Sequence, residues 1–391
     1  MDKDLDKENN TENIDKKSET EENKNDSETA SESANNTEEI SIEEEFKQSK
    51  IRLKKRLIYS SVTVVILVLL ASLFAAYGEK AYFEDNRLMM DTVITIKGYG
   101  FKGYLGMQAA FKKISEIEKL TSFYYGNSQL AKLNATGYHP YDFNNKFGRD
   151  LLREIAMGAK FYYESTEGYF DPSFAALHEI YGFHTPNKAG RLPSDDEIKN
   201  ILLKCGFTHV LRFEENGIKL DKESMIDFGG ITGGYAIVCA REILKASGCN
   251  TFLIDDSGDI WFQGEKPDKS PWTIAVRDPR DNSSLAKIVS TKPLAISTSG
   301  DYERFIVVDG KQYGHIMNPK TGRPADYYDS VTVVTNDPIQ SDVLSTAVFA
   351  MPPDMAFEWV EKKHLAALFL TKEGKVHLSS EGKKYFSEVK E

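Results

Sequence analysis

The sequence predicts an α+β fold, a single large domain with a mixed, largely antiparallel sheet and surrounding helices, preceded by a disordered tail and one transmembrane helix. From residue 79 onward, short β-rich runs alternate with amphipathic helical patterns. Hairpin-like turns such as Val308-Asp-Gly-Lys311 favour antiparallel pairing. An uncharged run precedes this region, and an almost entirely polar segment precedes that run. With 391 residues, 40% of them hydrophobic, the chain can build a substantial core.

Residues 1–46 form an acidic tail with 17 acidic residues against five lysines, and Phe46 is its only aromatic residue. Burial of so few apolar groups cannot offset the conformational entropy that the chain loses on folding. We therefore expect residues 1–46 to be disordered. Residues 47–56 carry six cations and no anion, which predicts a basic juxtamembrane segment. No cluster of Lys and Arg stands out beyond residue 56. A nucleic-acid partner is therefore not expected.

The uncharged run covers residues 57–78. As a helix it is about 33 Å long at roughly 1.5 Å per residue, which matches a hydrocarbon core of roughly 30 Å. We expect a transmembrane helix over 57–78. A buried core helix is one alternative, and a cleaved signal peptide is another, because Leu73-Phe-Ala-Ala76 offers small residues to a peptidase. The basic flank precedes the span, which predicts a single-pass cell-membrane protein with a cytoplasmic tail and an extracytoplasmic domain at 79–391.

The hydrophobic pattern predicts the elements of this domain. Strands are expected at 91–97, 251–254, 272–276, 305–308, 330–335 and 366–370, and helices at 105–120, 151–165, 195–204, 234–246, 341–350 and 353–363. The three cysteines, Cys205, Cys239 and Cys249, show no metal or redox spacing and are expected to be packing residues.

Gly98-Tyr-Gly100-Phe-Lys-Gly103 matches a dinucleotide-binding fingerprint between a strand and a helix. The acidic residues at a suitable distance, Glu116 and Glu118, lie inside the helical pattern, whereas a Rossmann unit places its acidic residue at the end of a second strand. We expect a plain turn, with the fingerprint as the alternative.

Ile226-Asp-Phe-Gly-Gly-Ile-Thr-Gly-Gly-Tyr235 places an acid and four glycines just ahead of an expected helix. Glycines permit close backbone approach, and the amides at a helix N-terminus favour a phosphate group. This pattern predicts a phosphate-binding segment, and a simple glycine-rich turn is the alternative.

Two polar residues, Asp342 and Thr346, lie four apart on one face of the helix expected from residue 341. A carboxylate and a hydroxyl in this arrangement can ligate a hard cation. Helix capping by Ser341 or Asp342 is the alternative. Two further segments carry polar groups: 294–302 has three hydroxyls and an acid, and 315–324 has an imidazole and two cations.

Taken in order, these segments resemble the ApbE family, the FAD:protein FMN transferases once labelled thiamine-biosynthesis lipoproteins. The resemblance runs from about Met90 to the C-terminus. It rests on 90–92, 122–124 with 127–130 and 133–135, 168–172, 227–235, 257–260, 272 with 276–279, 298–302, 315–324, 330–333 and 342–346.

The resemblance implies an enzyme that transfers FMN from its substrate FAD to a Thr or Ser hydroxyl of a target protein and releases AMP, with Mg²⁺ as cofactor. The acceptor is expected to be an extracytoplasmic or membrane electron-transfer protein. The implied FAD-binding residues are Met90, Tyr124, Tyr169, Phe170, Asp171, Asp227, Gly233 and Ile316. The implied metal ligands are Asp342, Thr346 and a backbone carbonyl near Gly230.

His315 is the candidate catalytic base for the acceptor hydroxyl, because its near-neutral pKa suits proton removal. A structural histidine bonded to its own turn is the alternative. Asp301 and Arg323 are expected to be turn and salt-bridge residues.

The chain departs from the family pattern at several positions. The family usually has Lys at Gly233, Gly at Asp91 and Ser257, and Asp at Val238 and Asn318. Losing the lysine removes a cation beside the phosphates. Two other functions therefore stay open: hydrolysis of FAD to FMN and AMP, and flavin binding without catalysis.

Overall fold

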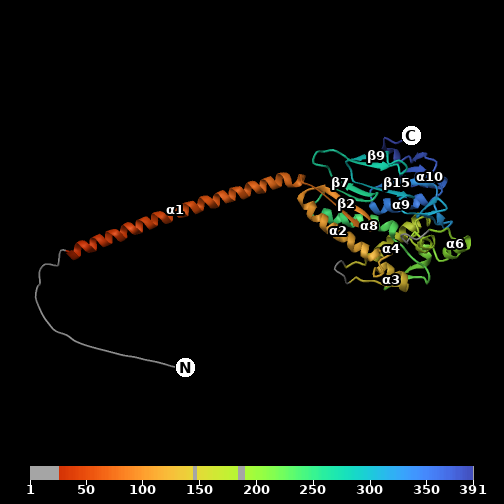
Figure 1. Cartoon of the computed structure of the whole chain (residues 1–391), viewed down its shortest axis with the longest axis horizontal. Helices are drawn as coiled ribbons and strands as arrows, with labels where there is room; N and C mark the ends of the chain where they lie inside the picture. The colour runs from red at the N-terminus through yellow and green to blue at the C-terminus, as the bar shows by residue number, and fades with distance from the viewer. Residues whose placement is uncertain (1–25, 144–147, 184–189, 391) are drawn as a thin grey trace, which may run out of the picture. The chain divides into compact units, whose positions relative to one another are not determined.

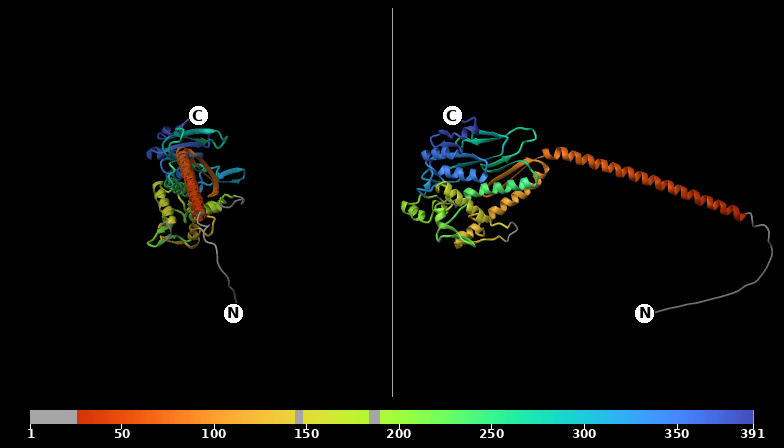
Figure 2. Two further views of the ribbon diagram at one scale, coloured as in Figure 1. Left: turned by 90° about the vertical axis from the view of Figure 1, so that its left-hand side faces the viewer. Right: turned by 180° about the vertical axis from the view of Figure 1, so that it is seen from behind.

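The structure of the protein is a computed structural model that describes residues 26–143, 148–183 and 190–390 (Figures 1 and 2). The chain divides into two compact units, Met1–Ala75 and Ala76–Glu391.

All but the last two residues of the long helix α1 (Asp26–Tyr77) belong to the first unit. Within this helix, Ser41–Phe74 is long and apolar enough to cross a membrane. Residues 26–46 are helical in the structure, where the sequence predicts disorder. Once an apolar segment has nucleated a helix, each further residue adds a hydrogen bond, and Glu, Lys and Ala propagate it well. The rest of the predicted disordered tail, 1–25, lies outside the described residues.

The second unit is built on an eight-stranded sheet in which every neighbouring pair of strands is antiparallel. Its strands, in spatial order, are β1 (Tyr82–Met89), β2 (Thr92–Tyr99), β6 (Thr251–Asp256), β7 (Asp259–Gln263), β10 (Leu294–Gly300), β15 (Tyr328–Thr335), β16 (Ala366–Thr371) and β17 (Val376–Leu378). The predicted largely antiparallel α+β fold is confirmed. A Rossmann unit needs parallel strands, so the fingerprint alternative for the glycine motif is wrong. Gly98 lies in β2 and Gly103 in the helix that follows, and the predicted turn is confined to Gly100 between them.

Three helices cover one face of this sheet: α2 (Phe101–Thr121), α8 (Gly229–Ala246) and α9 (Pro338–Ala350). A three-stranded sheet of β8 (Trp272–Arg277), β9 (Ser284–Ser290) and β18 (Phe386–Ser387) covers the other face. Figure 1 shows these layers, with β9 on one side of the large sheet and α8 and α9 on the other. The side chains of β16 alternate accordingly, since Ala367 and Phe369 pack toward the helices and Leu368 packs toward the small sheet.

The remaining elements build the part of the domain beyond the helical layer and the loops around the site. They are α3 (Gln129–Thr136), β3 (Tyr138–Pro140), α4 (Leu151–Ser165), α5 (Ala175–Tyr181), α6 (Asp195–Leu202), α7 (Phe207–Val210), β4 (Leu211–Phe213), β5 (Gly217–Leu220), β11 (Phe305–Val308), β12 (Lys311–Gly314), β13 (Met317–Asn318), β14 (Arg323–Pro324) and α10 (Pro353–Lys362). The 3₁₀ turns are Gly78–Lys80 and Gly382–Lys384. All three cysteines lie in the described part of the chain and form no disulfide.

Each predicted helix and strand is present, but two helices near the site begin earlier than predicted. Helix α8 begins at Gly229 instead of Gly234, and α9 begins at Pro338 instead of Ser341. The Asp337 side chain caps α9 by accepting hydrogen bonds from the N–H groups of Ile339 and Gln340, and Pro338 occupies the first turn.

Candidate active site

A cavity of about 560 Å³ opens where the turns of two sheet hairpins meet the N-terminal parts of α8 and α9. Eleven of the twelve residues that the sequence singles out line it: Met90, Tyr169, Phe170, Asp171, Asp227, Gly230, Gly233, His315, Ile316, Asp342 and Thr346. The twelfth, Tyr124, lies beside the cavity, where its hydroxyl accepts a hydrogen bond from Arg304 Nη1 at 3.3 Å. The structure therefore brings together residues spread over more than 250 positions of sequence, from 90 to 346.

Two tight turns border the cavity. Met90 and Asp91 join β1 to β2 with φ angles of 54° and 63°, and Ser257 joins β6 to β7 with a φ of 49°. Positive φ strains any residue with a Cβ atom, so glycine at Asp91 or Ser257 would relieve strain. The turns are tied together by a hydrogen bond between the Thr92 and Ser257 hydroxyls.

The glycine-rich segment forms the first turns of α8 instead of a loop ahead of it. Gly230 leaves helical geometry, with φ −83° and ψ 17°. The N–H of Gly234, which in a regular α-helix donates to the carbonyl of Gly230, donates to Asp342 Oδ2 at 2.8 Å. The kink thus joins the backbone of α8 to a carboxylate of α9.

Close approach of α8 and α9 brings these groups together, and it depends on Gly234. A Cβ atom there would lie 2.5 Å from the Pro338 carbonyl oxygen and 2.7 Å from the Ile339 Cα atom. No side chain fits against backbone at that distance. The contact places Asp342 over the glycine segment.

Asp342 is buried, with 6% of its surface exposed, and it lies in the second turn of α9. Since Asp337 caps the helix, the capping alternative for Ser341 and Asp342 is wrong. The Thr346 hydroxyl, one turn on, lies 3.3 Å from Ser299 Oγ and borders the Gly230 backbone, where a Cβ atom would be 3.8 Å from Thr346 Oγ1. A carboxylate, a hydroxyl and the backbone of a kinked glycine thus face one space.

Two further carboxylates, which the sequence reasoning missed, join Asp342. Asp256 and Asp259 end β6 and begin β7, directly opposite each other. Burial, and then repulsion by neighbouring carboxylates, raises the pKa of Asp256 to about 8 and that of Asp259 to about 7. The same causes raise the pKa of Asp342. Among the ion pairs of the described residues, none involves these three carboxylates. No group of three His, Cys, Asp or Glu side chains in the described part is already arranged to hold a metal ion.

Asp171 and Asp227 shape the cavity wall through local hydrogen bonds. Asp171 Oδ1 accepts from the N–H and the hydroxyl of Ser173, at 2.9 and 2.6 Å, and burial raises its pKa to about 6. Asp227 Oδ1 accepts from the Gly229 N–H at 2.9 Å, and burial raises its pKa as well. Asp227 therefore fixes the start of the glycine segment, and Asp171 fixes the turn beside it.

His315 lies at the cavity with its Nδ1 atom 3.1 Å from the Arg304 carbonyl oxygen. A carbonyl oxygen only accepts, so this contact assigns the proton to Nδ1 in the neutral ring and makes Nε2 the basic nitrogen. The ring of His178, from α5, lies 6.5 Å from that of His315, centroid to centroid. No motif marked His178 or Arg304, because each stands in a segment without a distinctive pattern.

Other residues named from the sequence have structural contacts. Asp301 forms an ion pair with Lys372, and Arg323 forms one with Asp195, as expected for salt-bridge residues. Asn318 is buried and closes its own turn by accepting from the Lys320 N–H at 2.9 Å.

The chain is thus an antiparallel α+β domain whose glycine-bearing helix meets a buried carboxylate and a hydroxyl in one cavity, the kind of concave site that binds small molecules. Comparison with known proteins identifies its family. A sequence model of the ApbE family matches residues 90–369, and the chain belongs to that family.

Relatives of known name agree with this assignment. The chain is 27% identical to the FAD:protein FMN transferase of Vibrio cholerae serotype O1 over 317 residues, covering 78% of this chain and 93% of that protein. It is 25% identical to the protein of the same name from Escherichia coli K12 over 264 residues, covering 66% and 74%. The crystal structure of the ApbE protein of Thermotoga maritima superposes with a TM-score of 0.73 at 30% identity, covering 79% of this chain and 100% of that one. The apo flavinyl transferase ApbE of Pseudomonas stutzeri gives 0.69 at 25% identity, covering 78% and 97%.

Proposed function

We propose that this chain is a membrane-anchored FAD:protein FMN transferase that moves FMN from FAD to a Thr or Ser hydroxyl of an extracytoplasmic or membrane electron-transfer protein and releases AMP. The observation that carries the proposal is the cavity, which gathers His315, Asp342, Thr346 and the kinked backbone at Gly230 in a chain of this family.

The donor set fits Mg²⁺. Asp342, Thr346 and the Gly230 carbonyl would hold it, because all three offer oxygen and Mg²⁺ takes oxygen ligands. When bound, Mg²⁺ supplies positive charge that offsets the negative charge of the FAD diphosphate. Asp342 Oδ2 is held in place by the Gly234 N–H, so this ligand is oriented before any ion binds.

The chain's own residues position the reactants and move one proton. The acceptor hydroxyl oxygen bonds to the phosphorus of the FMN phosphate, the bond from that phosphorus to the bridging oxygen breaks, and AMP leaves with the bridging oxygen. His315 Nε2 takes the hydroxyl proton, since its Nδ1 proton is directed at the Arg304 carbonyl. The buried Tyr169 and Phe170 supply apolar wall to the cavity.

A direct assay separates transfer from its alternatives. The full chain in detergent is incubated with FAD, Mg²⁺ and a purified extracytoplasmic electron-transfer protein that gains covalent flavin when co-expressed with it. We expect the acceptor to gain the mass of one FMN less one water, which is the mass of FAD less that of AMP, and an equal amount of AMP to appear. Free FMN with AMP, and no labelled acceptor, would indicate hydrolysis. Neither product, with FAD bound, would indicate a flavin-binding module, the alternative that Gly233 favours.

The membrane anchor is the second part of the proposal. The apolar stretch of α1 and the basic residues 47–56 before it support a span at 57–78, with the tail in the cytoplasm and residues 79–391 outside. Protease added to intact cells should digest the domain and leave the tail protected. A protected domain contradicts this topology, and a mature protein that lacks the tail indicates a cleaved signal peptide.

A further inference from the structure

One end of the second unit carries exposed aromatic and basic side chains next to the point where the chain enters the domain. The carbonyl oxygen of Ala81, which follows the 3₁₀ turn Gly78–Lys80, accepts a hydrogen bond from the Gly100 N–H at 2.8 Å. Tyr82 begins β1 and pairs with Tyr99 at the end of β2, so the start of α2 lies at the same end of the domain. We call this end the anchor-side face, and its members are Lys80, Tyr82, Phe101, Lys102, Tyr104 and Leu105.

The apolar members of the anchor-side face are exposed although their side chains are large. Phe101, Tyr104 and Leu105 expose 46%, 49% and 57% of their surface, and Tyr82 exposes 56%. Because these three α2 residues are spaced by three and four positions, they share one side of the helix, opposite its buried side. A group of exposed apolar side chains of this kind marks an interaction surface.

The position of this face in the chain indicates its partner. The proposed span ends at Gly78, and four residues at no more than roughly 3.6 Å each keep Tyr82 within about 14 Å of that end. The headgroup layer on each side of a bilayer is roughly 5–8 Å deep. The start of β1 is therefore held next to the lipid headgroups by the covalent chain itself.

The residue types of the face match that environment. Tyrosine favours the boundary between lipid and water, because its ring enters the apolar layer while its hydroxyl group stays hydrated. Lys80 and Lys102 are exposed, and neither forms an ion pair with another residue in the described part of the chain. Their ammonium groups can therefore meet the phosphate groups of lipids.

We propose that the anchor-side face rests in the headgroup layer of the membrane, so that the domain is docked on the lipid surface instead of hanging from a free tether. This inference rests on the proposed membrane anchor and adds an orientation of the domain to it. Thr92, at the other end of β2, borders the cavity, and seven residues at roughly 3.3 Å each place it about 23 Å from Tyr99. The docked face is thus the end opposite the cavity, which stays open to an acceptor protein.

The test measures quenching of tryptophan fluorescence by lipids that are brominated near the headgroup. The full chain is reconstituted in phosphatidylcholine vesicles that contain phosphatidylglycerol, and Tyr104→Trp places the probe on the anchor-side face. Tyr125→Trp is the matched control, because Tyr125 is also exposed, at 52%, but follows the far end of α2, a helix roughly 31 Å long at about 1.5 Å per residue. The three native tryptophans are buried and are common to both variants.

We expect brominated lipid to remove most of the emission that Tyr104→Trp adds to the wild-type chain, and to leave unchanged the emission that Tyr125→Trp adds. Lys102→Glu, combined with Tyr104→Trp, should lower the quenching, because anionic lipid repels a carboxylate. Lys119→Glu, at an exposed lysine in the last turn of α2, is its control and should leave the quenching unchanged.

The outcomes separate docking from the anchor. Equal quenching of Tyr104→Trp and Tyr125→Trp, in vesicles that carry the chain, would overturn the docking and leave the anchor in place. Dimers formed by chemical cross-linking in that sample would then assign the anchor-side face to a second copy of the chain. A chain that does not float with the vesicles in a density gradient would overturn the anchor and this inference with it.

Discussion

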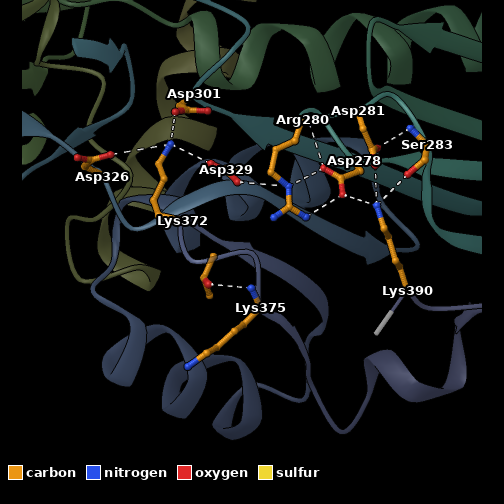
Figure 3. A network of polar contacts seen from close by, with 11 residues as sticks. Asp278, Arg280, Asp281, Ser283, Asp301, Asp326, Asp329, Lys372, Lys375 and Lys390 are labelled. Atoms are coloured by element: carbon orange, nitrogen blue, oxygen red, sulfur yellow. Dashed lines mark hydrogen bonds and ion pairs between the residues drawn. The ribbon is translucent and has the colours of Figure 1, made fainter. Parts of the chain in front are cut away.

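Two groups of carboxylates in the same domain are arranged in opposite ways. Figure 3 shows the first, in which Asp278, Asp281, Asp301, Asp326 and Asp329 surround Arg280, Lys372 and Lys390. Asp278 is buried, and its carboxylate meets Arg280 Nη2 at 2.8 Å and Lys390 Nζ at 3.1 Å. The Arg280 guanidinium holds the pKa of Asp278 below its usual range. This network ties the C-terminal residues to the small sheet.

In the second group, Asp256 and Asp342 are buried and Asp259 is partly buried. None of the three has an ion-pair partner among the described residues, and their pKa values are raised. Carboxylates that pair with cations of the same chain stabilise the fold, and the first group is therefore a structural network. Buried carboxylates without such cations can bind a charged ligand, and the second group is therefore typical of a binding site. Variants in the cavity should therefore affect activity, and variants in the paired network should affect stability.

The largest effect is expected from His315→Ala. If this residue takes the acceptor proton, transfer should fall by roughly 10² to 10⁴ fold while FAD affinity stays nearly unchanged. Single-turnover labelling of the acceptor measures the rate, and flavin fluorescence measures the affinity. Normal transfer by this variant would return His315 to the structural alternative, in which its bond to the Arg304 carbonyl is its whole role.

Asp342→Asn should lower transfer by roughly 10² to 10³ fold, the range for losing one electrostatic contact to the transition state. The amide keeps the shape and an oxygen ligand but loses the charge, so excess Mg²⁺ should partly restore the rate. Circular dichroism should show an intact fold, because Asp337 and not Asp342 caps α9. Full activity of Asp342→Asn at low Mg²⁺ would place the metal elsewhere.

Asp278→Asn should leave transfer unchanged and lower the free energy of unfolding by about 1–3 kcal/mol, the range for a hydrogen-bonded charged group. The pKa of Asp278 is lowered from 3.8, so its contribution is present above that pH and is lost as the pH falls through the folded-state pKa. The wild-type chain should therefore lose stability in acid more steeply than the variant. Denaturant unfolding between pH 2 and 7 measures the free energy of unfolding of both chains. If this free energy falls equally steeply with pH in the wild-type chain and in Asp278→Asn, the pairing contributes little to stability.

The sequence predicts the helices and strands of the domain well, because the spacing of hydrophobic residues indicates which face of a helix or strand is buried. It was less successful at the starts of α8 and α9. There Asp337-Pro338 carries a capping signal that the hydrophobic pattern hides. The sequence also predicts that the glycine run lies ahead of the helix, whereas the run is helical and packs closely against α9.

The sequence predicts some of the cavity residues and not others, because only some of them stand in recognisable motifs. Asp342, Thr346 and His315 stand in motifs that a family resemblance can reveal. Asp256 stands beside a motif and acquires its significance only from the pairing of β6 with β7 and from the absence of a side chain at Gly233. Such long-range convergence follows from packing, which local pattern does not encode. The helix at residues 26–46 is a different case. The polar composition of these residues predicts disorder, but the adjacent apolar helix extends through them because each added residue adds a backbone hydrogen bond.

The most direct test of the account measures FAD affinity of the full chain, by quenching of flavin fluorescence, as a function of Mg²⁺ concentration. Because Asp256, Asp259 and Asp342 have no ion-pair partner among the described residues, FAD should bind weakly without Mg²⁺ and at least tenfold more tightly at saturation. Asp342→Asn should lose this coupling, whereas Asp278→Asn should keep it. FAD affinity that is independent of Mg²⁺ in the wild-type chain would contradict the account.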